Sequence, residues 1–161
     1  MAANQGDVVI AWEPWATMWP KAEPFARLHF DEVEGELARK RPFGPVIETW
    51  AKLDEIGVLK IVTAHIRGAL VGYCMWTVSP DIESFGTMKA EQGPIYVDDA
   101  AAPFGLGYKM LKFSIAGLHK MGVKLFFLHH KVRGRGKRLW MWFKRLGAVK
   151  TQEEYFLWIG D

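Results

Sequence analysis

The chain has 161 residues, half of them apolar, with 8 Trp, 10 Phe and one cysteine; this excludes an internal disulfide, argues against disorder and predicts a single domain over residues 1–161. No apolar run approaches the ~20 residues of a membrane span and no signal-peptide pattern opens the chain, so we expect a cytoplasmic protein. The net charge of +3 conceals an asymmetry, because residues 1–99 carry 9 Lys and Arg against 15 Asp and Glu, whereas residues 100–152 carry 12 basic residues and no acidic one.

The N-terminal third predicts one strand and two helices. Residues 8–12 are apolar enough for a short strand, and residues 14–20, with two prolines and two tryptophans, predict a structured loop. Pro24 suits the first turn of a helix that the basic residues 39–41 close. A second amphipathic helix follows and ends at Gly57.

From residue 58 onward, the spacing of the apolar residues changes from helical to alternating. Residues 58–66 and 69–78 predict two strands, and Arg67-Gly68 between them predicts the turn of an antiparallel hairpin. The apolar residues of the segment 82–89 have neither helical nor alternating spacing, which predicts an irregular excursion of the chain away from the sheet. Residues 92–97 then predict the next strand.

A turn with two glycines follows this strand. Residues 98–103 predict a loop, and Gly105 and Gly107 begin a helix whose apolar positions keep helical spacing up to Gly122. The N–H groups at the start of a helix have no intrahelical acceptors, and the helix dipole favours an anion there. The turn is therefore a candidate phosphate site, although an ordinary strand-to-helix turn has the same pattern.

In the last part of the chain, predicted strands alternate with predicted helices. Residues 123–130 predict a strand, and because a helix separates them from residues 92–97 the two strands should pair in parallel. A basic amphipathic helix ends at Gly147, and residues 148–151 and 155–159 predict one or two closing strands. The predicted fold class is therefore α/β, a central mixed β-sheet flanked by helices in the order β–α–α–β–β–β–α–β–α–β.

This order, with a glycine turn after the fourth strand, resembles the GNAT superfamily of acyl-CoA-dependent N-acetyltransferases. The resemblance covers nearly the whole chain as topology, and as motif it covers residues 95–109 and 136–148. It implies a GNAT-like domain that binds acetyl-CoA and transfers its acetyl group to an unidentified primary amine by direct attack.

The resemblance also implies which residues would bind the cofactor. The fourth strand would bind the pantetheine arm of acetyl-CoA through its backbone, and the glycine turn would bind the pyrophosphate through its N–H groups. The strand residues are Ile95, Tyr96 and Val97, and the turn residues are Phe104, Gly105, Leu106, Gly107, Tyr108 and Lys109.

Three positions depart from the family pattern. Ala102 stands where the phosphate loop usually opens with Arg or Gln, and Gly136 stands where the last helix often begins with Asn. Phe143 stands where a tyrosine often acts as the general acid, and a phenyl ring has no proton to donate. The fold is therefore better supported than the activity.

Amine acetylation requires a base for the substrate ammonium group. In the family, a carboxylate on the fourth strand often has this role, and Glu91 is the nearest candidate here, with Asp98 and Asp99 as alternatives. A glutamate at such a position is also commonly a solvated side chain. The adjacent His129 and His130 offer a second candidate base. No cluster of further ligand residues accompanies them, so we predict no metal site.

A narrower resemblance concerns the C-terminal segment. The basic helix, the sequence Leu-Gly-Ala-Val and the following Glu-Glu-Tyr with its apolar strand resemble GNAT-like proteins that short-tailed bacteriophages encode among their virion genes. This implies a second hypothesis, a catalytically degenerate virion-associated or assembly protein in contact with other virion proteins. Such a protein would reside in the host cytoplasm or the virion.

Lys131–Arg138, KVRGRGKR, is the densest basic cluster. Under the GNAT resemblance, Arg135 or Lys137 would meet a phosphate of the cofactor's adenosine. The cluster also fits the backbone of a nucleic acid, with Trp140 available to stack on a base. An acidic protein surface and a merely solvated basic face are two further interpretations.

Overall fold

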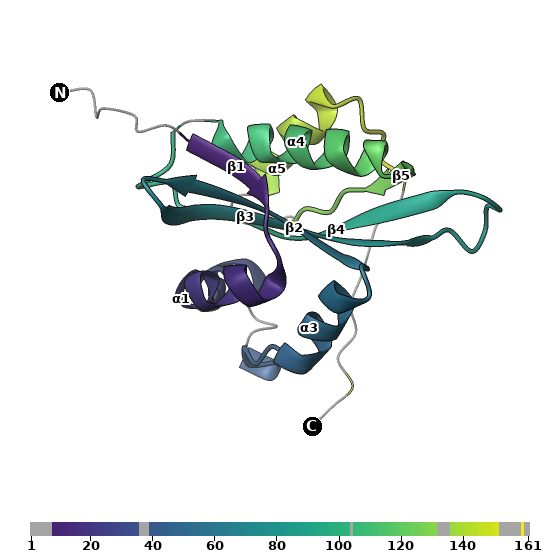
Figure 1. Ribbon diagram of the computed structural model, residues 1–161. Helices are drawn as coiled ribbons and strands as arrows, with labels where there is room; N and C mark the ends of the chain where they lie inside the picture. Colours follow the sequence, from purple (N-terminus) through teal and green to yellow (C-terminus); the bar gives the residue numbers. More distant parts are fainter. Residues whose placement is uncertain (1–7, 36–38, 104, 132–135, 152–158, 160–161) are drawn as a thin grey trace.

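The computed structural model describes residues 8–35, 39–103, 105–131, 136–151 and 159 (Figure 1). The elements are β1 (Val8–Trp12), α1 (Trp15–Glu34), α3 (Ile47–Glu55), β2 (Leu59–Ile66), β3 (Ala69–Pro80), β4 (Met88–Val97), α4 (Leu106–Lys120), β5 (Val123–Phe127) and α5 (Gly136–Arg145). The strands form one sheet in the order β1-β2-β3-β4-β5, antiparallel up to β4 and parallel between β4 and β5. The predicted α/β class with a mixed sheet is confirmed.

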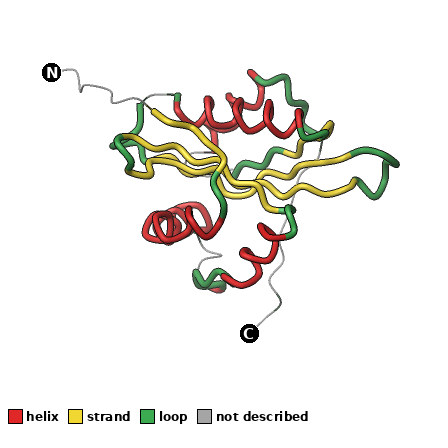
Figure 2. The backbone as a smooth tube through the Cα atoms, viewed as in Figure 1, coloured by secondary structure: helices red, strands yellow, loops and turns green. Residues whose placement is uncertain are grey.

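Helices cover both faces of the sheet. α4 and α5 lie on one face, and α1 and α3 lie on the other (Figures 1 and 2). Alternate residues of β2 pack against the two helical layers, because successive side chains along a strand point to opposite faces of the sheet. Val62 and Ala64 pack into the core under α4, whereas Leu59 and Ile61 pack into the core under α1.

The prediction of a loop over residues 14–20 is wrong, because α1 already begins at Trp15. Two contacts fix this early start. The ring of Trp15 stacks on that of Trp50, with centroids 5.7 Å apart, and the Asp54 carboxylate accepts a hydrogen bond of 2.9 Å from the Trp15 N–H. Both prolines of α1 lie inside the helix, where intrinsic propensity disfavours them.

The hairpin predictions are confirmed, with one change in length. Arg67 and Gly68 have φ angles of +51° and +80°, as a tight turn between twisted antiparallel strands requires. β3 and β4 extend further than predicted, because pairing continues to Pro80 and Met88. The excursion predicted at residues 82–89 is therefore a shorter turn at the tip of a long hairpin.

The C-terminal helix is confirmed as α5. Residues 148–151, predicted as a strand, have no regular secondary structure. Most of the other closing strand, predicted at residues 155–159, lies outside the described residues.

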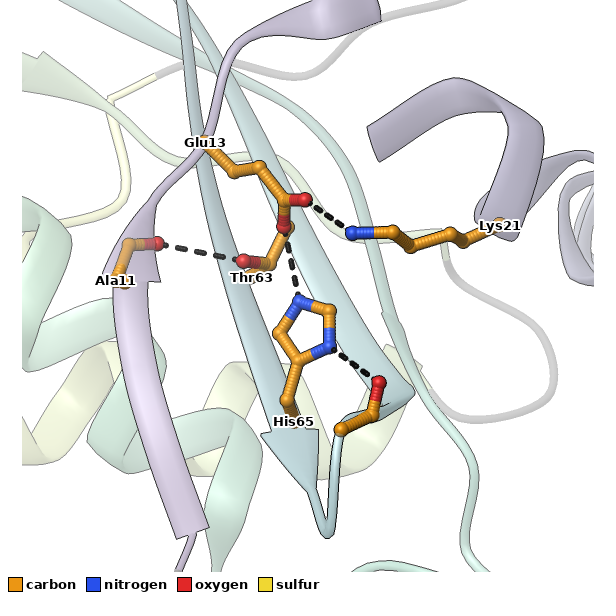
Figure 3. A network of polar contacts seen from close by, with 6 residues as sticks. Ala11, Glu13, Lys21, Thr63 and His65 are labelled. Carbon is orange, nitrogen blue, oxygen red and sulfur yellow. Dashed lines mark hydrogen bonds and ion pairs between the residues drawn. The ribbon is translucent and has the colours of Figure 1, made fainter. Parts of the chain in front are cut away.

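A polar network joins β1, β2 and the start of α1 (Figure 3). The Glu13 carboxylate accepts hydrogen bonds from the Lys21 ammonium, at 2.5 Å, and from Nε2 of His65, at 2.9 Å. The Thr63 hydroxyl donates to the carbonyl of Ala11 at 3.5 Å. Burial alone would raise the pKa of Glu13, but the hydrogen bonds from Lys21 and His65 outweigh it and hold that pKa below its ordinary value.

Candidate cofactor and active site

β4 and β5 run side by side only at the start of β4. Their parallel register begins at Met88 with Val123 and ends at Glu91 with Phe127. Beyond Glu91, β4 continues to Val97 along β3. The predicted parallel pairing is confirmed, but residues 88–91 make it rather than residues 92–97, and β5 ends at Phe127 rather than at His130.

A β-bulge accompanies the separation of the two strands. Cys74 pairs with Ile95 and Trp76 pairs with Gln92, so two steps along β3 match three steps along β4. The extra residue lies at Gly93-Pro94, and proline has no N–H to offer a neighbouring strand. A bulge bends its strand and increases the local twist, which directs the second half of β4 away from β5. We call the region between residues 92–97 and the chain after Phe127 the strand parting.

Gln92 bridges the strand parting. Its Nε2 donates hydrogen bonds of 3.3 Å to the carbonyls of His129 and Gly93. These two acceptors fix the orientation of the amide, because the reversed amide would place its oxygen against two carbonyl oxygens. Oε1 is then buried, and no donor among the described residues lies within hydrogen-bond distance. A buried acceptor of this kind requires a donor from elsewhere, such as water or a ligand.

The glycine turn lies at the end of the strand parting and begins α4. Gly105 is the N-cap residue and has a φ of +82°, a left-handed conformation that favours glycine. The Lys109 N–H donates to the Gly105 carbonyl at 3.1 Å. The Leu106 N–H donates to the Pro103 carbonyl at 3.2 Å, so this predicted phosphate donor is already paired. The N–H groups of Gly107 and Tyr108 belong to the first turn, where a helix presents unpaired donors to an anion. Phe104, the first predicted turn residue, lies outside the described residues.

Gly107 has a different role, which the sequence did not reveal. A Cβ at this position would overlap the ring of Trp142. Gly107 is therefore required for the close packing of α5 on α4. Two further contacts hold α5 there: Arg138 donates to both carboxylate oxygens of Asp99, at 3.0 and 3.1 Å, and the Arg145 guanidinium lies 5.0 Å above the Tyr108 ring.

The predicted strand residues occupy both faces of β4. Ile95 and Val97 pack against the core under α4. Tyr96 faces the opposite layer, where its ring stacks on Phe25 at 5.4 Å and on Tyr73 at 5.6 Å. The side chains thus hold this segment of β4 between the two helical layers, beside the strand parting.

Glu91 lies at the closed end of the strand parting, opposite Phe127. Its side chain is 45 % exposed, and Oε1 accepts a hydrogen bond of 2.8 Å from the Lys89 ammonium. This hydrogen bond raises the pKa of Lys89 above its ordinary value. No hydrogen bond to the second carboxylate oxygen is found among the described residues.

The position of the usual phenol is occupied by a buried ring. Phe143 is 3 % exposed and belongs to the core under α4. The His130 ring lies 6.1 Å from the Phe143 ring and 6.1 Å from the Trp140 ring. Of the two predicted histidines, His130 therefore lies beside the Phe143 position, whereas His129 contributes a backbone carbonyl to Gln92.

The described ends of the basic cluster form ion pairs within the chain. Lys131 Nζ lies 3.0 Å from Glu34 Oε1, and Arg138 pairs with Asp99. Arg135, a predicted phosphate ligand, lies outside the described residues, as does the side chain of Lys137. Lys109, at the glycine turn, is exposed.

Other types of site receive no support from the described part of the chain. A hollow of ≈ 680 Å³ lies at the β3–β4 turn, lined by residues between Pro80 and Met88, away from the glycine turn. No three His, Cys, Asp or Glu side chains gather there or elsewhere among the described residues as metal ligands would. None of the described helices combines the length and the apolarity needed to cross a membrane.

Comparison with known proteins identifies the fold. No family model and no curated protein sequence matches the chain. Solved structures do match. An aminoglycoside acetyltransferase from an uncultured soil metagenomic sample has a TM-score of 0.72 at 12 % identity, covering 96 % of this chain and 99 % of that one. A predicted acetyltransferase with acetyl-CoA from Clostridium acetobutylicum has a TM-score of 0.68 at 12 % identity, covering 94 % and 96 %.

A glucosamine-6-phosphate N-acetyltransferase from Arabidopsis thaliana is also similar, with a TM-score of 0.66 at 14 % identity over 96 % of this chain and 99 % of that one. None of these three structures is a virion protein, so the phage hypothesis finds no support in them. At these identities the similarity concerns the fold alone. Together with the parallel β4–β5 pair and the helices on both faces of the sheet, it shows that the chain has the GNAT acetyltransferase fold.

Proposed function

We propose that this protein is an acetyl-CoA-dependent N-acetyltransferase that acts on a primary amine by direct attack. The observation that carries the proposal is that the strand parting leads directly to the glycine turn at the start of α4. With a rise of ~3.3 Å per residue, the segment from Gln92 to Val97 offers at most roughly 17 Å of strand to an elongated ligand, which would reach the helix N-terminus with an anionic end.

The residues present fit this cofactor. The N–H groups of Gly105, Gly107 and Tyr108 would hold the pyrophosphate, and the Lys109 ammonium would add a positive charge. The backbone of Ile95, Tyr96 and Val97 would lie along the pantetheine arm. The buried Oε1 of Gln92 supplies an acceptor inside the strand parting. When bound, acetyl-CoA supplies the activated acyl group.

Glu91 is the proposed general base. Lys89 holds one oxygen of its carboxylate, which leaves the other to accept a proton from the ammonium form of the acceptor amine. The free amine can then form the C–N bond while the C–S bond breaks. Glu91 lies at the closed end of the strand parting, far from the proposed phosphate site. A base for the acceptor amine should lie there, because the thioester and the pyrophosphate are at opposite ends of acetyl-CoA.

No phenol protonates the departing thiolate at the usual position, because Phe143 occupies it. A thiol with a pKa of ~8.5 leaves fairly well without an acid. Water or the exposed His130 beside Phe143 can supply the proton. We therefore expect slow turnover rather than none, since general acid catalysis typically contributes about 10²–10⁴-fold.

A matched pair of glycine variants tests cofactor binding. Gly105 and Gly122 both have positive φ angles, +82° and +95°, and at neither position would a Cβ meet another heavy atom within 4 Å. Both Gly105→Val and Gly122→Val should lower Tm through backbone strain. Acetyl-CoA should raise the Tm of the wild type and of Gly122→Val, but not that of Gly105→Val.

Absence of any shift for the wild type at millimolar acetyl-CoA would contradict the proposal. Gly107 is unsuitable for this test because a side chain there would meet Trp142. Once binding is established, a panel of primary amines, aminoglycosides included, identifies the acceptor through release of the CoA thiol. Binding without turnover on any amine would favour a catalytically degenerate protein.

A further inference from the structure

The tip of the β3–β4 hairpin presents two large apolar side chains to solvent. We call residues 81–87 the hairpin tip; it projects beyond the rest of the sheet (Figure 1). Ile82 is 95 % exposed and Phe85 is fully exposed. Exposed apolar groups that lie together mark interaction surfaces more often than single exposed residues do.

The hairpin tip is an ordered turn. The Asp81 N–H donates to the Thr87 carbonyl at 2.8 Å, and the Thr87 N–H donates to the Ser84 carbonyl at 3.1 Å. The hydroxyl groups of Ser84 and Thr87 lie 2.9 Å apart. Ile82 and Phe85 are therefore held outward by a preorganised backbone, which reduces the entropy that a partner must remove on binding.

The hairpin tip is also acidic. Asp81 and Glu83 flank Ile82, and neither carboxylate lies within ion-pair distance of a cation among the described residues. The nearest basic residue along the strand, Lys89, is hydrogen-bonded to Glu91, and Asp81 and Glu83 interact with its charge only at longer range. A partner for this surface must therefore combine apolar and basic groups.

Such a surface lies beside Met88, the residue that directly follows the hairpin tip. The register pairs Met88 with Val123, which places the end of α4 and the start of β5 next to it. There Met121 is 54 % exposed, and Lys120 and Lys124 in the same segment are exposed as well. We call these three residues the basic shelf. It belongs to the region of the chain, residues 100–152, that contains no acidic residue.

We propose that two copies of this chain form a reversible dimer in which the hairpin tip of each copy binds the basic shelf of the other. Ile82 and Phe85 cover Met121, whose flexible side chain adapts to an apolar partner. Asp81 and Glu83 pair with Lys120 and Lys124. Because both complementary surfaces lie at one edge of the same chain, a two-fold axis makes both contacts at once. This proposal is independent of the proposed enzymatic activity.

Sedimentation equilibrium over a wide range of protein concentration tests the proposal. The wild type should show a monomer–dimer equilibrium. Phe85→Ser should weaken the dimer by about tenfold or more, as loss of a central aromatic contact typically does. Leu28→Ser is the matched control, since Leu28 is 67 % exposed on α1, far from both surfaces in the fold.

Charge reversal identifies the pairing of the two surfaces. Glu83→Lys and Lys120→Glu should each weaken the dimer several-fold, and the double variant should restore the affinity to within roughly threefold of the wild type. A monomeric wild type at all concentrations would overturn the proposal, as would a dimer that Phe85→Ser leaves intact. Phe85-dependent binding of a monomeric protein to lipid vesicles would instead assign the hairpin tip to a membrane surface.

Discussion

Individual residues in the strand parting have distinct physical roles. Gly105 provides a backbone conformation, whereas Gly107 provides space for the Trp142 ring. Gln92 is buried with one half of its amide bonded to two carbonyls and the other half lacking a donor among the described residues. A buried acceptor left unsatisfied costs about 1–3 kcal/mol, so its retention is expected where a ligand or ordered water completes it.

Replacing Glu91 tests the proposed base. Glu91→Gln should lower the rate of acetyl transfer about 10²-fold at neutral pH, where an amine acceptor is mainly protonated, and by less as the pH rises and the free amine becomes common. The readout is the pH profile of kcat/KM with an acceptor from the amine panel. Glu55→Gln, in an exposed ion pair with Lys52, is the control. An unchanged rate, or a loss that is equal at every pH, would remove Glu91 from the mechanism.

At the scale of helices and strands, the sequence predicts an element best where neighbouring residues determine its conformation. The Arg67-Gly68 turn and the start of α4 at Leu106 follow from residues that lie next to one another. The early start of α1 depends on Trp50 and Asp54, which are distant in sequence, and no local pattern reports them. The packing of Trp142 on Gly107 is similarly long-range.

The strand parting was only partly predictable. The parallel crossover follows from the order of strand, helix and strand. The bulge at Gly93-Pro94 shifted the paired segment to residues 88–91, and a Gly-Pro pair inside a strand is the signal that marks it. Gln92 was predicted on the correct strand, whereas Glu91 was predicted just before the strand and lies inside β4. The bridge from Gln92 to His129 required the register, because His129 lies beyond the end of β5.

The junction between α1 and the sheet predicts a pH dependence of stability. The folded state lowers the pKa of Glu13, so its contribution is complete above the ordinary glutamate pKa near 4.5 and is lost as the pH falls toward the lower folded value. Glu13→Gln should destabilise the protein by about 1 kcal/mol at pH 7 and reduce the acid-side slope of the free energy of unfolding. Urea unfolding between neutral and acidic pH measures this slope.

Glu48→Gln, at an exposed position in the first turn of α3, serves as the control for this experiment. It should leave the acid-side slope as in the wild type. Equal slopes for the wild type and Glu13→Gln would show that the network in Figure 3 does not lower the pKa of Glu13 in solution.

At the scale of the whole molecule, charge and function are divided between the two helical layers. The acid-free residues 100–152 include α4, β5 and α5, which surround the glycine turn, whereas α1 and α3 belong to the acidic part of the chain. A positive field over the first layer favours an anionic cofactor at the start of α4. The same asymmetry provides the opposite charges of the hairpin tip and the basic shelf.

A titration of the ¹⁵N-labelled protein with acetyl-CoA, followed by amide NMR, tests the central claim most directly. We expect progressive shifts of the backbone amides of residues 105–109 and 95–97 and of the side-chain amide of Gln92, with the β1 amides unchanged. The Gln92 side chain reports the strand parting, and the glycine turn reports the phosphate site, so both ends of the ligand are observed in one experiment. Absence of shifts at millimolar acetyl-CoA, or shifts confined to regions away from β4 and α4, would contradict the account.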